Sequence, residues 1–360
     1  MGVTQKGCDT ITREIELQVS QIALADFQLT VGTVSLYTHY MRMPKPRQQE
    51  PIAASRGRFT VIGLGELLWD LLPAGKQLGG APGNFAYMTA LLGDRAVVVS
   101  RVGKDRLGNA AARRLTRLGL PSTFLQVDTR HPTSTVNVTI DEQGQPKFEI
   151  LQNVAWDFFE WTPEWQALAA EADAVCFGSL AQRAAQSRAT ILAFLEALRP
   201  GALRIFDVNL RQAFFSKEIL SESASRADII KLNDDEIMRV TELLGGPVRS
   251  QQSAARWLLK KYGVKLVCIT RGGKGSLLVT PEAADEHPGY PVKVADTVGA
   301  GDAFTAALVH KYLRKASLRA MNAAANRLGS WVASQVGATP GADPKAILEF
   351  HNSNEEGTAA

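Results

Sequence analysis

Several features that identify large classes of protein are scarce or missing in this 360-residue sequence. It has only three cysteines, which are far apart, so neither a disulfide framework nor the paired spacing of a zinc site can be drawn from them. Two of them, Cys176 and Cys268, lie in apolar runs, which predicts buried thiols in a reducing, cytoplasmic compartment. The sequence also has no apolar run as long as the roughly 18 residues that a transmembrane helix needs, so we expect no membrane association.

Clusters of like charge are missing as well. The 40 basic and 36 acidic residues give a net charge of +4, and the basic residues are scattered along the chain. A nucleic-acid-binding surface usually shows as a block or stripe of Lys and Arg, so we expect no nucleic-acid partner. What is present is a hydrophobic fraction of 45% and a charged fraction of 21%, which is ordinary for a globular protein with a large core.

The first 57 residues differ in character from the rest. Acidic residues interrupt them and no apolar segment follows a basic start, which excludes a secretory signal. The stretch 41–58 is rich in Pro, Arg and Gln, as linkers are. We expect residues 1–57 to form an N-terminal extension with little order. A small appended element, or a true start at Met41 or Met43, are the explanations left open for it.

From residue 59 onward, short apolar runs alternate with helical patterns, and we interpret them as one α/β domain over 58–345, followed by a tail over 346–360. Most of the runs are apolar at odd and even positions alike, which is typical of parallel strands buried on both faces. The repeated strand–helix–strand order predicts a doubly wound, mostly parallel sheet flanked by helices, with ligands at the carboxyl ends of its strands. The expected strands are 59–63, 96–102, 174–177, 203–207, 229–232, 266–270 and 276–279, and the expected helices are 83–92, 106–118, 184–198, 234–243, 253–261, 301–314 and 318–335.

One segment has a different period. Residues Ser134–Ile140 alternate polar and apolar side chains, a turn sequence follows, and Lys147–Leu151 returns, which predicts a hairpin with one wet face. Leu67–Leu72 is a candidate third strand beside it. Together they predict a small antiparallel β lid from about 67–78 and 132–151. Its free face is a candidate surface for pairing two copies of the chain in a homodimer.

The most informative motif is Asp296–Phe304, in which a glycine-rich turn runs directly into an expected helix. Backbone N–H groups at a helix N-terminus, with glycines that allow close approach, suit a phosphate group. The carboxylate of Asp302 lies in the same first turn. A lone Asp at such a position is usually just a favourable charge at a helix N-terminus. The surrounding Gly-Ala-Gly and the second acid, Asp296, favour a phosphoryl-transfer site instead.

A second glycine-rich segment is Gly79–Asn84, which we interpret as a tight loop before a helix. Asn84 can donate and accept hydrogen bonds with one amide group and therefore suits a polyol. Asp70 follows the first expected strand, where its carboxylate can accept hydrogen bonds from two sugar hydroxyls. Taken alone, the loop is equally compatible with an ordinary helix entry, and Asp70 with a surface position.

Two further motifs have both a structural and a functional interpretation. Asn233 and Glu236 have the spacing of a helix capping box, and also of a pair that holds Mg²⁺ through water near nucleotide phosphates. Thr270–Gly275 is a glycine-rich turn after a buried strand, but it is neither a Walker A sequence nor a dinucleotide-binding fingerprint. A nucleotide must therefore be bound by another device.

In their order along the chain, these motifs resemble the ribokinase-like (PfkB) carbohydrate kinase family. Asp296–Phe304 is similar to the family's Asp-Thr-x-Gly-Ala-Gly-Asp signature, Gly79–Asn84 to its N-terminal glycine signature, and Asn233–Glu236 to its Asn-x-x-Glu magnesium motif. The resemblance extends over about residues 58–342. It implies ATP-dependent transfer of a phosphate to a sugar hydroxyl, with Mg²⁺ and, in some members, K⁺ as cofactors.

The resemblance also implies a role for individual residues, with Asp302 as the catalytic base. The other expected roles are an anion hole from Val298, Gly299, Ala300 and Gly301; substrate binding by Asp70, Gly80, Asn84 and Arg211; nucleotide binding by Asn233, Thr270, Gly272, Gly275 and Asn326; water-mediated Mg²⁺ binding by Asn233 and Glu236; and a K⁺ site from Asp296, Val298, Val332, Gln335 and Gly337.

Within the family, the Gly-Glu-x-x-x-Asp and Gly-Gly-Ala-Pro-x-Asn segments and Phe206–Arg211 most resemble fructokinases, so fructose is the expected substrate. Phe206–Arg211 also resembles 2-keto-3-deoxygluconate kinases, in which the arginine can face an acidic substrate, and this stays an alternative. A nucleoside kinase and a catalytically silent, regulatory relative are further alternatives. A silent protein has no reason to retain Asp302, Asn233 and Glu236 together.

Overall fold

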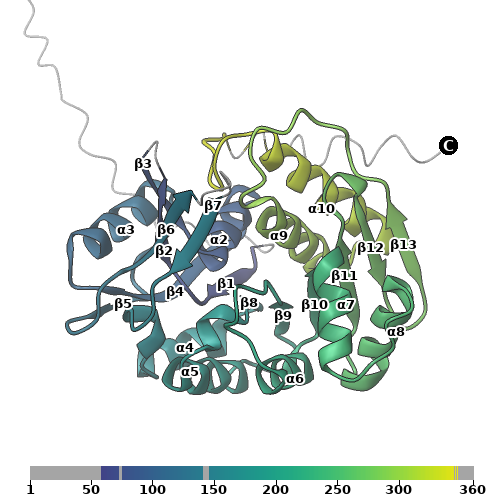
Figure 1. Cartoon of the computed structure of the whole chain (residues 1–360), viewed down its shortest axis with the longest axis horizontal. Helices are drawn as coiled ribbons and strands as arrows, with labels where there is room; N and C mark the ends of the chain where they lie inside the picture. The colour runs from purple at the N-terminus through teal and green to yellow at the C-terminus, as the bar shows by residue number, and fades with distance from the viewer. Residues whose placement is uncertain (1–57, 73–74, 141–145, 344, 346, 348–360) are drawn as a thin grey trace, which may run out of the picture. The chain divides into compact units, whose positions relative to one another are not determined.

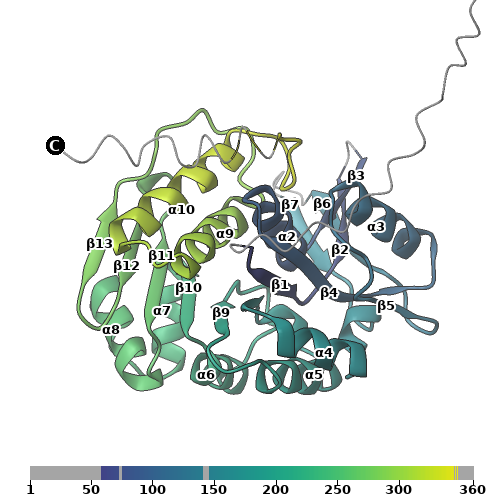
Figure 2. The ribbon, with the colours of Figure 1, turned by 180° about the vertical axis from the view of Figure 1, so that it is seen from behind.

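Short apolar segments form a nine-stranded sheet through the described part of the chain, residues 58–72, 75–140, 146–343, 345 and 347 (Figures 1 and 2). The strand order is β13-β12-β11-β10-β9-β8-β1-β4-β5. The strands from β11 to β5 pair in parallel, and β12 and β13 add an antiparallel edge. Their bounds are β1 Thr60–Leu64, β4 Arg95–Gly103, β5 Leu125–Asp128, β8 Ala174–Phe177, β9 Leu203–Asp207, β10 Ile229–Asn233, β11 Leu266–Thr270, β12 Ser276–Val279 and β13 Ala284–His287.

Alternate residues of these strands contribute to two separate hydrophobic clusters, one on each face of the sheet. In β1, Ile62 and Leu64 belong to one cluster and Val61 belongs to the other. This confirms the expectation drawn from strands that are apolar at odd and even positions alike. Helices α4 (Pro163–Glu171), α5 (Ala185–Glu196), α6 (Lys217–Arg226), α7 (Asp234–Leu243) and α8 (Gln251–Tyr262) cover the first cluster, and α2 (Ala81–Leu91), α3 (Arg106–Arg117), α9 (Ala300–Leu313) and α10 (Leu318–Ala333) cover the second.

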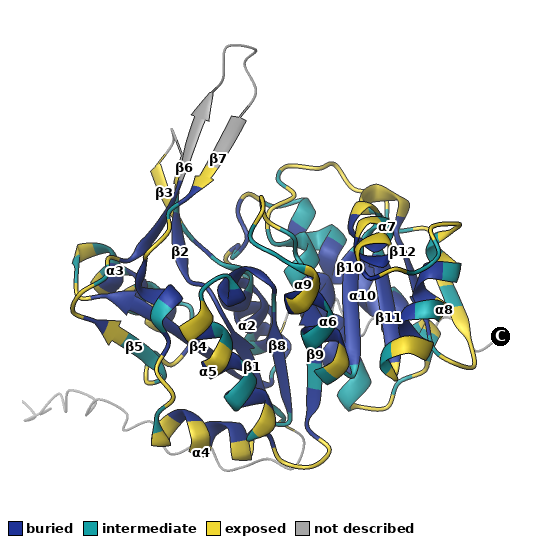
Figure 3. Ribbon diagram, turned by 60° about the horizontal axis from the view of Figure 1, so that its bottom comes forward, coloured by how far each residue is buried: buried dark blue, intermediate teal, exposed yellow. Residues whose placement is uncertain are grey.

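A second, four-stranded sheet stands out from the body of the domain (Figure 3). It consists of two antiparallel hairpins that join through parallel pairing of β2 with β6, whereas the sequence predicted one hairpin with a candidate third strand beside it. Trp69 ties its base to the body by donating from Nε1 to Leu107 O of α3 at 3.0 Å. The four strands are β2 Leu68–Leu72, β3 Gly75–Gly79, β6 Ser134–Ile140 and β7 Pro146–Ile150.

The observed elements include helices α4 and α6, which were not expected, and they differ from the expected ones in two further ways. The edge strands β5 and β13 were not expected, because half or more of their residues remain in contact with solvent and they contain no apolar run. The interpretation of Gly79–Asn84 as a loop is wrong from Ala81 onward, because α2 already begins there. Pro82 fits that first turn, since a proline lacks an N–H group that the helix would leave unpaired anyway.

The predicted extension over 1–57 and most of the predicted tail lie outside the described residues. Among the described residues, every helix is too short or too polar to span a lipid bilayer. Cys176 and Cys268 are buried, as predicted, and burial raises the pKa of both thiols.

Candidate active site

Parallel pairing brings the carboxyl ends of neighbouring strands to one edge of the sheet. Glu66 follows β1, Asp207 ends β9, Asn233 ends β10 and Thr270 ends β11. Helix α9 begins at the same edge, because Asp302 in its first turn lies close enough to Asp207 for their charges to interact. Polar side chains from distant parts of the sequence therefore converge where ligands bind in open α/β sheets.

The turn before α9 is shaped for an anion. Gly299 is the N-cap of the helix and has a φ of 80°, and a Cβ there would lie 2.7 Å from Ala338 Cα, so only glycine fits. Of the four residues predicted to form the anion hole, Val298 donates its N–H to Asp296 and Ala300 donates to Thr297 O. The N–H groups of Gly299 and Gly301 have no partner among the described residues. Both amides are therefore available to a phosphoryl group.

Asp302 has the properties of a general base. Asn84 Nδ2 of α2 donates to Asp302 Oδ2 at 2.8 Å, and the side chain keeps a partly exposed surface that a substrate can reach. Burial raises the pKa of Asp302 to about 6, the nearby Asp207 charge adds to this effect, and the Asn84 hydrogen bond and Lys231 oppose it. A base with a pKa just below neutral is mostly ionised at pH 7 and can still take up a proton. Asn84, predicted to bind sugar, thus contacts the carboxylate of Asp302 itself.

A buried ion pair behind Asp302 was missed at the level of sequence. Lys231 Nζ lies 3.0 Å from Asp207 Oδ1, and Thr305 Oγ1 lies 3.0 Å from Asp207 Oδ2. The only signal for it is a lysine in an otherwise apolar strand, since a charged residue in a buried strand needs a partner.

Glu66 is a second functional candidate that the sequence interpretation missed. It is 4% exposed, and its Oε2 has no hydrogen-bond partner among the described residues. Burial raises the pKa of Glu66 to about 7, while the backbone N–H groups of Glu66 and Ala81 and the charge of Arg211 oppose the rise. Near neutral pH this carboxyl group is therefore about half protonated and can donate as well as accept a hydrogen bond.

The predicted sugar-binding residues lie where the second sheet leaves the body. Asp70 is within β2, opposite Gln77 of β3, and burial raises the pKa of its carboxyl group while Arg211 lowers it. Gly80 has a φ of 109° and packs against the Glu66 backbone, so it is required for the entry to α2. Arg211 is exposed, and its charge acts on Asp70, Glu66 and Asp302 alike. The structure brings these side chains within electrostatic range of one another.

Asn233 and Glu236 form the capping box of α7. Glu236 accepts from Asn233 N at 2.9 Å through Oε2 and from Leu210 N at 2.7 Å through Oε1. Each carboxylate oxygen retains one further lone-pair direction, with which it can contact a metal directly or through a water molecule. No group of three or more His, Cys, Asp and Glu side chains arranged for direct metal binding occurs among the described residues.

The predicted nucleotide-binding residues have diverse surroundings. Gly272 has a φ of 54° and faces open space, whereas Gly275 packs against the backbone after β13. Thr270 Oγ1 donates to Leu232 O at 3.3 Å. Asn326 is buried, and its amide group donates to Ser276 and Asn322 of the protein itself. In this structure, Gly272 and Thr270 are thus better placed to meet a ligand than Gly275 and Asn326.

Asp296 connects two loops near the catalytic turn. Its carboxylate accepts from Val298 N and from Gly337 N, both at 3.0 Å. Three of the residues predicted for a K⁺ site are thereby brought together. Val332 is buried, and its carbonyl accepts from Gln335 N at the end of α10. The donors around Asp296 are backbone amides, so a cation there depends on carbonyl groups of the same loops.

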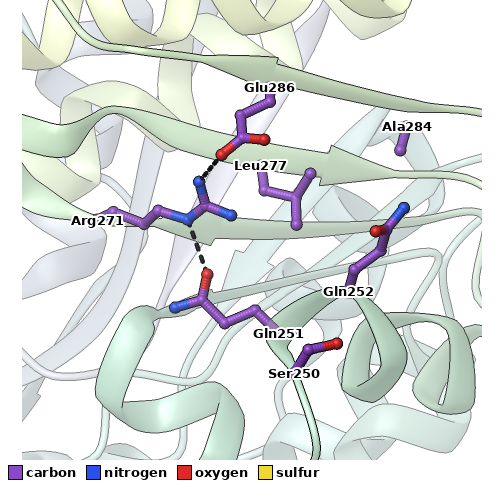
Figure 4. A pocket seen from close by; sticks show the side chains of 7 residues that line it. All are labelled: Ser250, Gln251, Gln252, Arg271, Leu277, Ala284 and Glu286. Carbon is purple, nitrogen blue, oxygen red and sulfur yellow. Dashed lines mark hydrogen bonds and ion pairs between the residues drawn. The ribbon is translucent and has the colours of Figure 1, made fainter.

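Two cavities of the described structure are lined by residues other than Asp302. One, of about 480 Å³, is lined by Arg271, whose guanidinium group bonds Gln251 and Glu286 (Figure 4). The other, of about 450 Å³, lies beside β3 and α3 and is lined by cationic side chains that include Lys76 and Arg114. Neither is lined by a residue of the catalytic turn.

Comparison with known proteins adds independent information. The family model described as pfkB family carbohydrate kinase matches residues 74–346. A fructokinase from Escherichia coli is 31% identical over 260 residues, which are 68% of this chain and 82% of the relative. The structure of an uncharacterized sugar kinase from Pyrococcus horikoshii has a TM-score of 0.70 at 28% identity, with coverage of 81% of this chain and 97% of that one. A fructokinase from Vibrio cholerae O395, solved with fructose, ADP and calcium ion bound, has a TM-score of 0.67 at 26% identity, with coverage of 82% and 99%.

Proposed function

Because the chain belongs to the pfkB family of carbohydrate kinases, we propose that it transfers the γ-phosphate of ATP to a primary hydroxyl group of fructose. The observation that carries the proposal is the pairing of Asp302 with the two available amides of Gly299 and Gly301 in the first turn of α9. A base and an anion-binding turn on one helix end are what phosphoryl transfer to an alcohol requires.

The reaction follows from the positions of these groups. The sugar hydroxyl gives its proton to Asp302 as its oxygen attacks the γ-phosphorus, the bond from phosphorus to the bridging oxygen breaks, and ADP leaves. The N–H groups of Gly299 and Gly301 bind the oxygens of the transferred group. Such preorganised donors act strongly, because they need no reorganisation when the charge moves. Mg²⁺ bound with ATP would neutralise phosphate charge, with Glu236 holding it through water.

Fructose is supported by the fructokinases among the relatives and by the carboxylate of Asp70 at the base of the lid. A carboxylate can accept hydrogen bonds from two vicinal hydroxyls of a sugar. Arg211 keeps 2-keto-3-deoxygluconate as the second candidate, because its charge reaches the same carboxylates and an acidic substrate could pair with it.

A screen of ADP release separates these candidates. Fructose, 2-keto-3-deoxygluconate, ribose, tagatose 6-phosphate and adenosine are each supplied with MgATP, with and without added K⁺. We expect fructose to give the highest kcat/KM. A higher value for the keto acid would make Arg211 the partner of a substrate carboxylate, and no turnover with any substrate would favour a regulatory relative.

The second sheet is also the proposed dimer surface. Its edge strand β3 carries exposed Lys76 and Gln77, and Leu71 of the adjoining strand is 37% exposed. Light scattering at micromolar concentration with substrate present is expected to give twice the mass of one chain. A monomeric mass under these conditions would contradict this proposal and leave the kinase assignment unchanged.

A further inference from the structure

The buried ion pair of Lys231 and Asp207 lies directly against the turn that carries Asp302. The two residues are 7% and 5% exposed, and their Nζ and Oδ1 atoms are 3.0 Å apart. Lys231 Nζ also lies 3.1 Å from the position that a Cβ would take on Gly301. The missing side chain of Gly301 therefore leaves room for an ammonium group against the backbone of the anion-binding turn.

The other carboxylate oxygen of Asp207 is held from α9. Thr305 Oγ1 lies 3.0 Å from Asp207 Oδ2 and 3.0 Å from Gly301 O, and the threonine is completely buried. Residues three apart on a helix share a face, so the same turn of α9 presents Asp302 and contacts Asp207. Thr305 thus links the ion pair to α9 through its contact with Asp207, and the Lys231 ammonium group packs against Gly301.

Charges of opposite sign act on Asp302 from this pair. Asp207 raises the pKa of the Asp302 carboxyl group and Lys231 lowers it. The Lys231 ammonium group is paired with the Asp207 carboxylate at 3.0 Å. The other groups that face Asp302 are Asn84 from α2, Arg211 from the loop after β9, and Glu66 and Cys176 from the ends of β1 and β8.

We infer that Asp207 is a positioning residue for phosphoryl transfer, which holds the Lys231 ammonium group against the backbone of Gly301. The inference rests on the proposed function. Held there, the ammonium charge adds to the attraction of the anion-binding turn for a phosphoryl group. The Asp207 carboxylate keeps the ammonium group from pairing with Asp302 instead. Without Asp207, Lys231 would be drawn to Asp302, which would then be a weaker base.

The pair can be tested by changes of opposite sign. Asp207→Asn and Lys231→Met are compared through the pH profile of kcat/KM, which reports ionisation in the free enzyme, with fructose or the best sugar of the screen and MgATP. Loss of the Asp207 charge should move the acidic limb to lower pH by about 0.5–1 unit, and loss of the Lys231 charge should move it upward by a similar amount. Lys231→Met should also lower kcat by about 10–100-fold with little change in the KM for the sugar.

Asp94→Asn is the matched control, because Asp94 is an equally buried carboxylate with cationic partners at the other end of α9. Its pH profile should match that of the wild type. Shifts of opposite sign for the pair, with none in the control, support the inference. Shifts in the same direction, or an unshifted profile in folded variants, overturn it.

Removal of a buried charge can prevent folding, and Thr305 supplies a milder test. Thr305→Val should lower kcat by about 5–10-fold at unchanged KM, and Thr305→Ser should restore it, since only the hydroxyl group contacts Asp207. Wild-type turnover in a folded Thr305→Val variant would overturn the inference. Asp302→Asn distinguishes failure of the proposed function from failure of this inference. If Asp302→Asn stays active, the proposed base is wrong. If it is inactive while Asp207→Asn and Lys231→Met have the pH profile of the wild type, only the role of Asp207 is refuted.

Discussion

A buried or partly buried carboxylate lies near each end of helix α9: Asp302 in its first turn, and Asp94, from the segment before β4, beside its last turn. The surroundings of the two carboxylates are opposite. At the far end, Asp94 accepts from both guanidinium nitrogens of Arg314, from the ring of His310 and from Phe59 N. Burial acts to raise the pKa of Asp94, but these hydrogen bonds outweigh it and hold the pKa below its ordinary value. At the near end, burial and the like charge of Asp207 raise the pKa of Asp302 to about 6, and the one hydrogen bond from Asn84 opposes the rise without reversing it.

The opposite directions of the two pKa shifts mean that ionised Asp94 stabilises the folded protein, whereas ionised Asp302 destabilises it. A lowered pKa means that ionised Asp94 stabilises the folded protein above the ordinary pKa of 3.8, and this stabilisation is lost as the pH falls through the folded value. A raised pKa means the reverse for Asp302, whose ionisation costs stability as the pH rises from about 4 to 6. Perturbation in this destabilising direction is typical of functional groups.

The strongest way to sharpen the comparison is Asp302→Asn. A general base contributes about 10²–10⁴-fold, so kcat should fall by at least that order while the affinity for ATP changes little. The same change should increase the free energy of unfolding at pH 8 by about 1–3 kcal/mol, since it removes an ionised group that burial disfavours. Steady-state kinetics, nucleotide titration and urea unfolding measure the three quantities. Near wild-type turnover would refute the catalytic assignment.

The opposite result is expected at the far end of the helix. Asp94→Asn should lower the free energy of unfolding at pH 7 by about 3 kcal/mol, because it leaves Arg314 and His310 without their buried partner. The loss should begin to shrink below about pH 4, where Asp94 takes up a proton in the unfolded state, and it should disappear only as the pH falls through the lowered pKa of the folded state. Urea unfolding at pH 7 and pH 3.5 checks both statements, and kcat of the folded variant should stay close to that of the wild type. A large loss of kcat without loss of stability would contradict the assignment of a structural role to Asp94 and a catalytic role to Asp302.

The two ends of α9 also differ in how far their side-chain contacts could be predicted from sequence. The near end was predictable, because Gly299, Gly301 and Asp302 form one continuous motif. The Asp94–Arg314 pair joins residues 220 positions apart, and Lys231 and Asp207 lie on different strands, so their pairing depends on a strand order that no local pattern specifies. Most regular elements with apolar periodicity were predicted to within a few residues, but the helices α4 and α6 were missed, and the polar edge strands β5 and β13 have no such signal.

A third carboxylate tests whether a raised pKa alone marks a catalytic group. Burial also raises the pKa of Asp70, which belongs to β2 rather than to α9. Asp70→Asn weakens hydrogen bonds to the sugar in the ground and transition states alike, so the KM for the sugar should rise by about 10-fold and more than kcat falls. Initial rates over a range of sugar concentrations measure the split. A loss confined to kcat would place Asp70 with Asp302 among the groups that act in the chemical step.

The smallest effects are expected at the N-terminal boundary, where Phe59 is the first of the described residues to contact Asp94 and Arg314 at the far end of α9. Its N–H donates to Asp94 Oδ1 at 3.2 Å, and its ring lies 5.1 Å from the Arg314 guanidinium carbon. Deletion of residues 1–55 keeps both contacts and should leave the free energy of unfolding and kcat nearly unchanged. Deletion of residues 1–59 removes a hydrogen bond to a charged acceptor and should cost about 1–3 kcal/mol of stability, again without affecting kcat of the folded enzyme. Urea unfolding of the two truncated proteins, side by side, tests this boundary. An insoluble or inactive protein after the shorter deletion would show that the kinase domain depends on residues before 56.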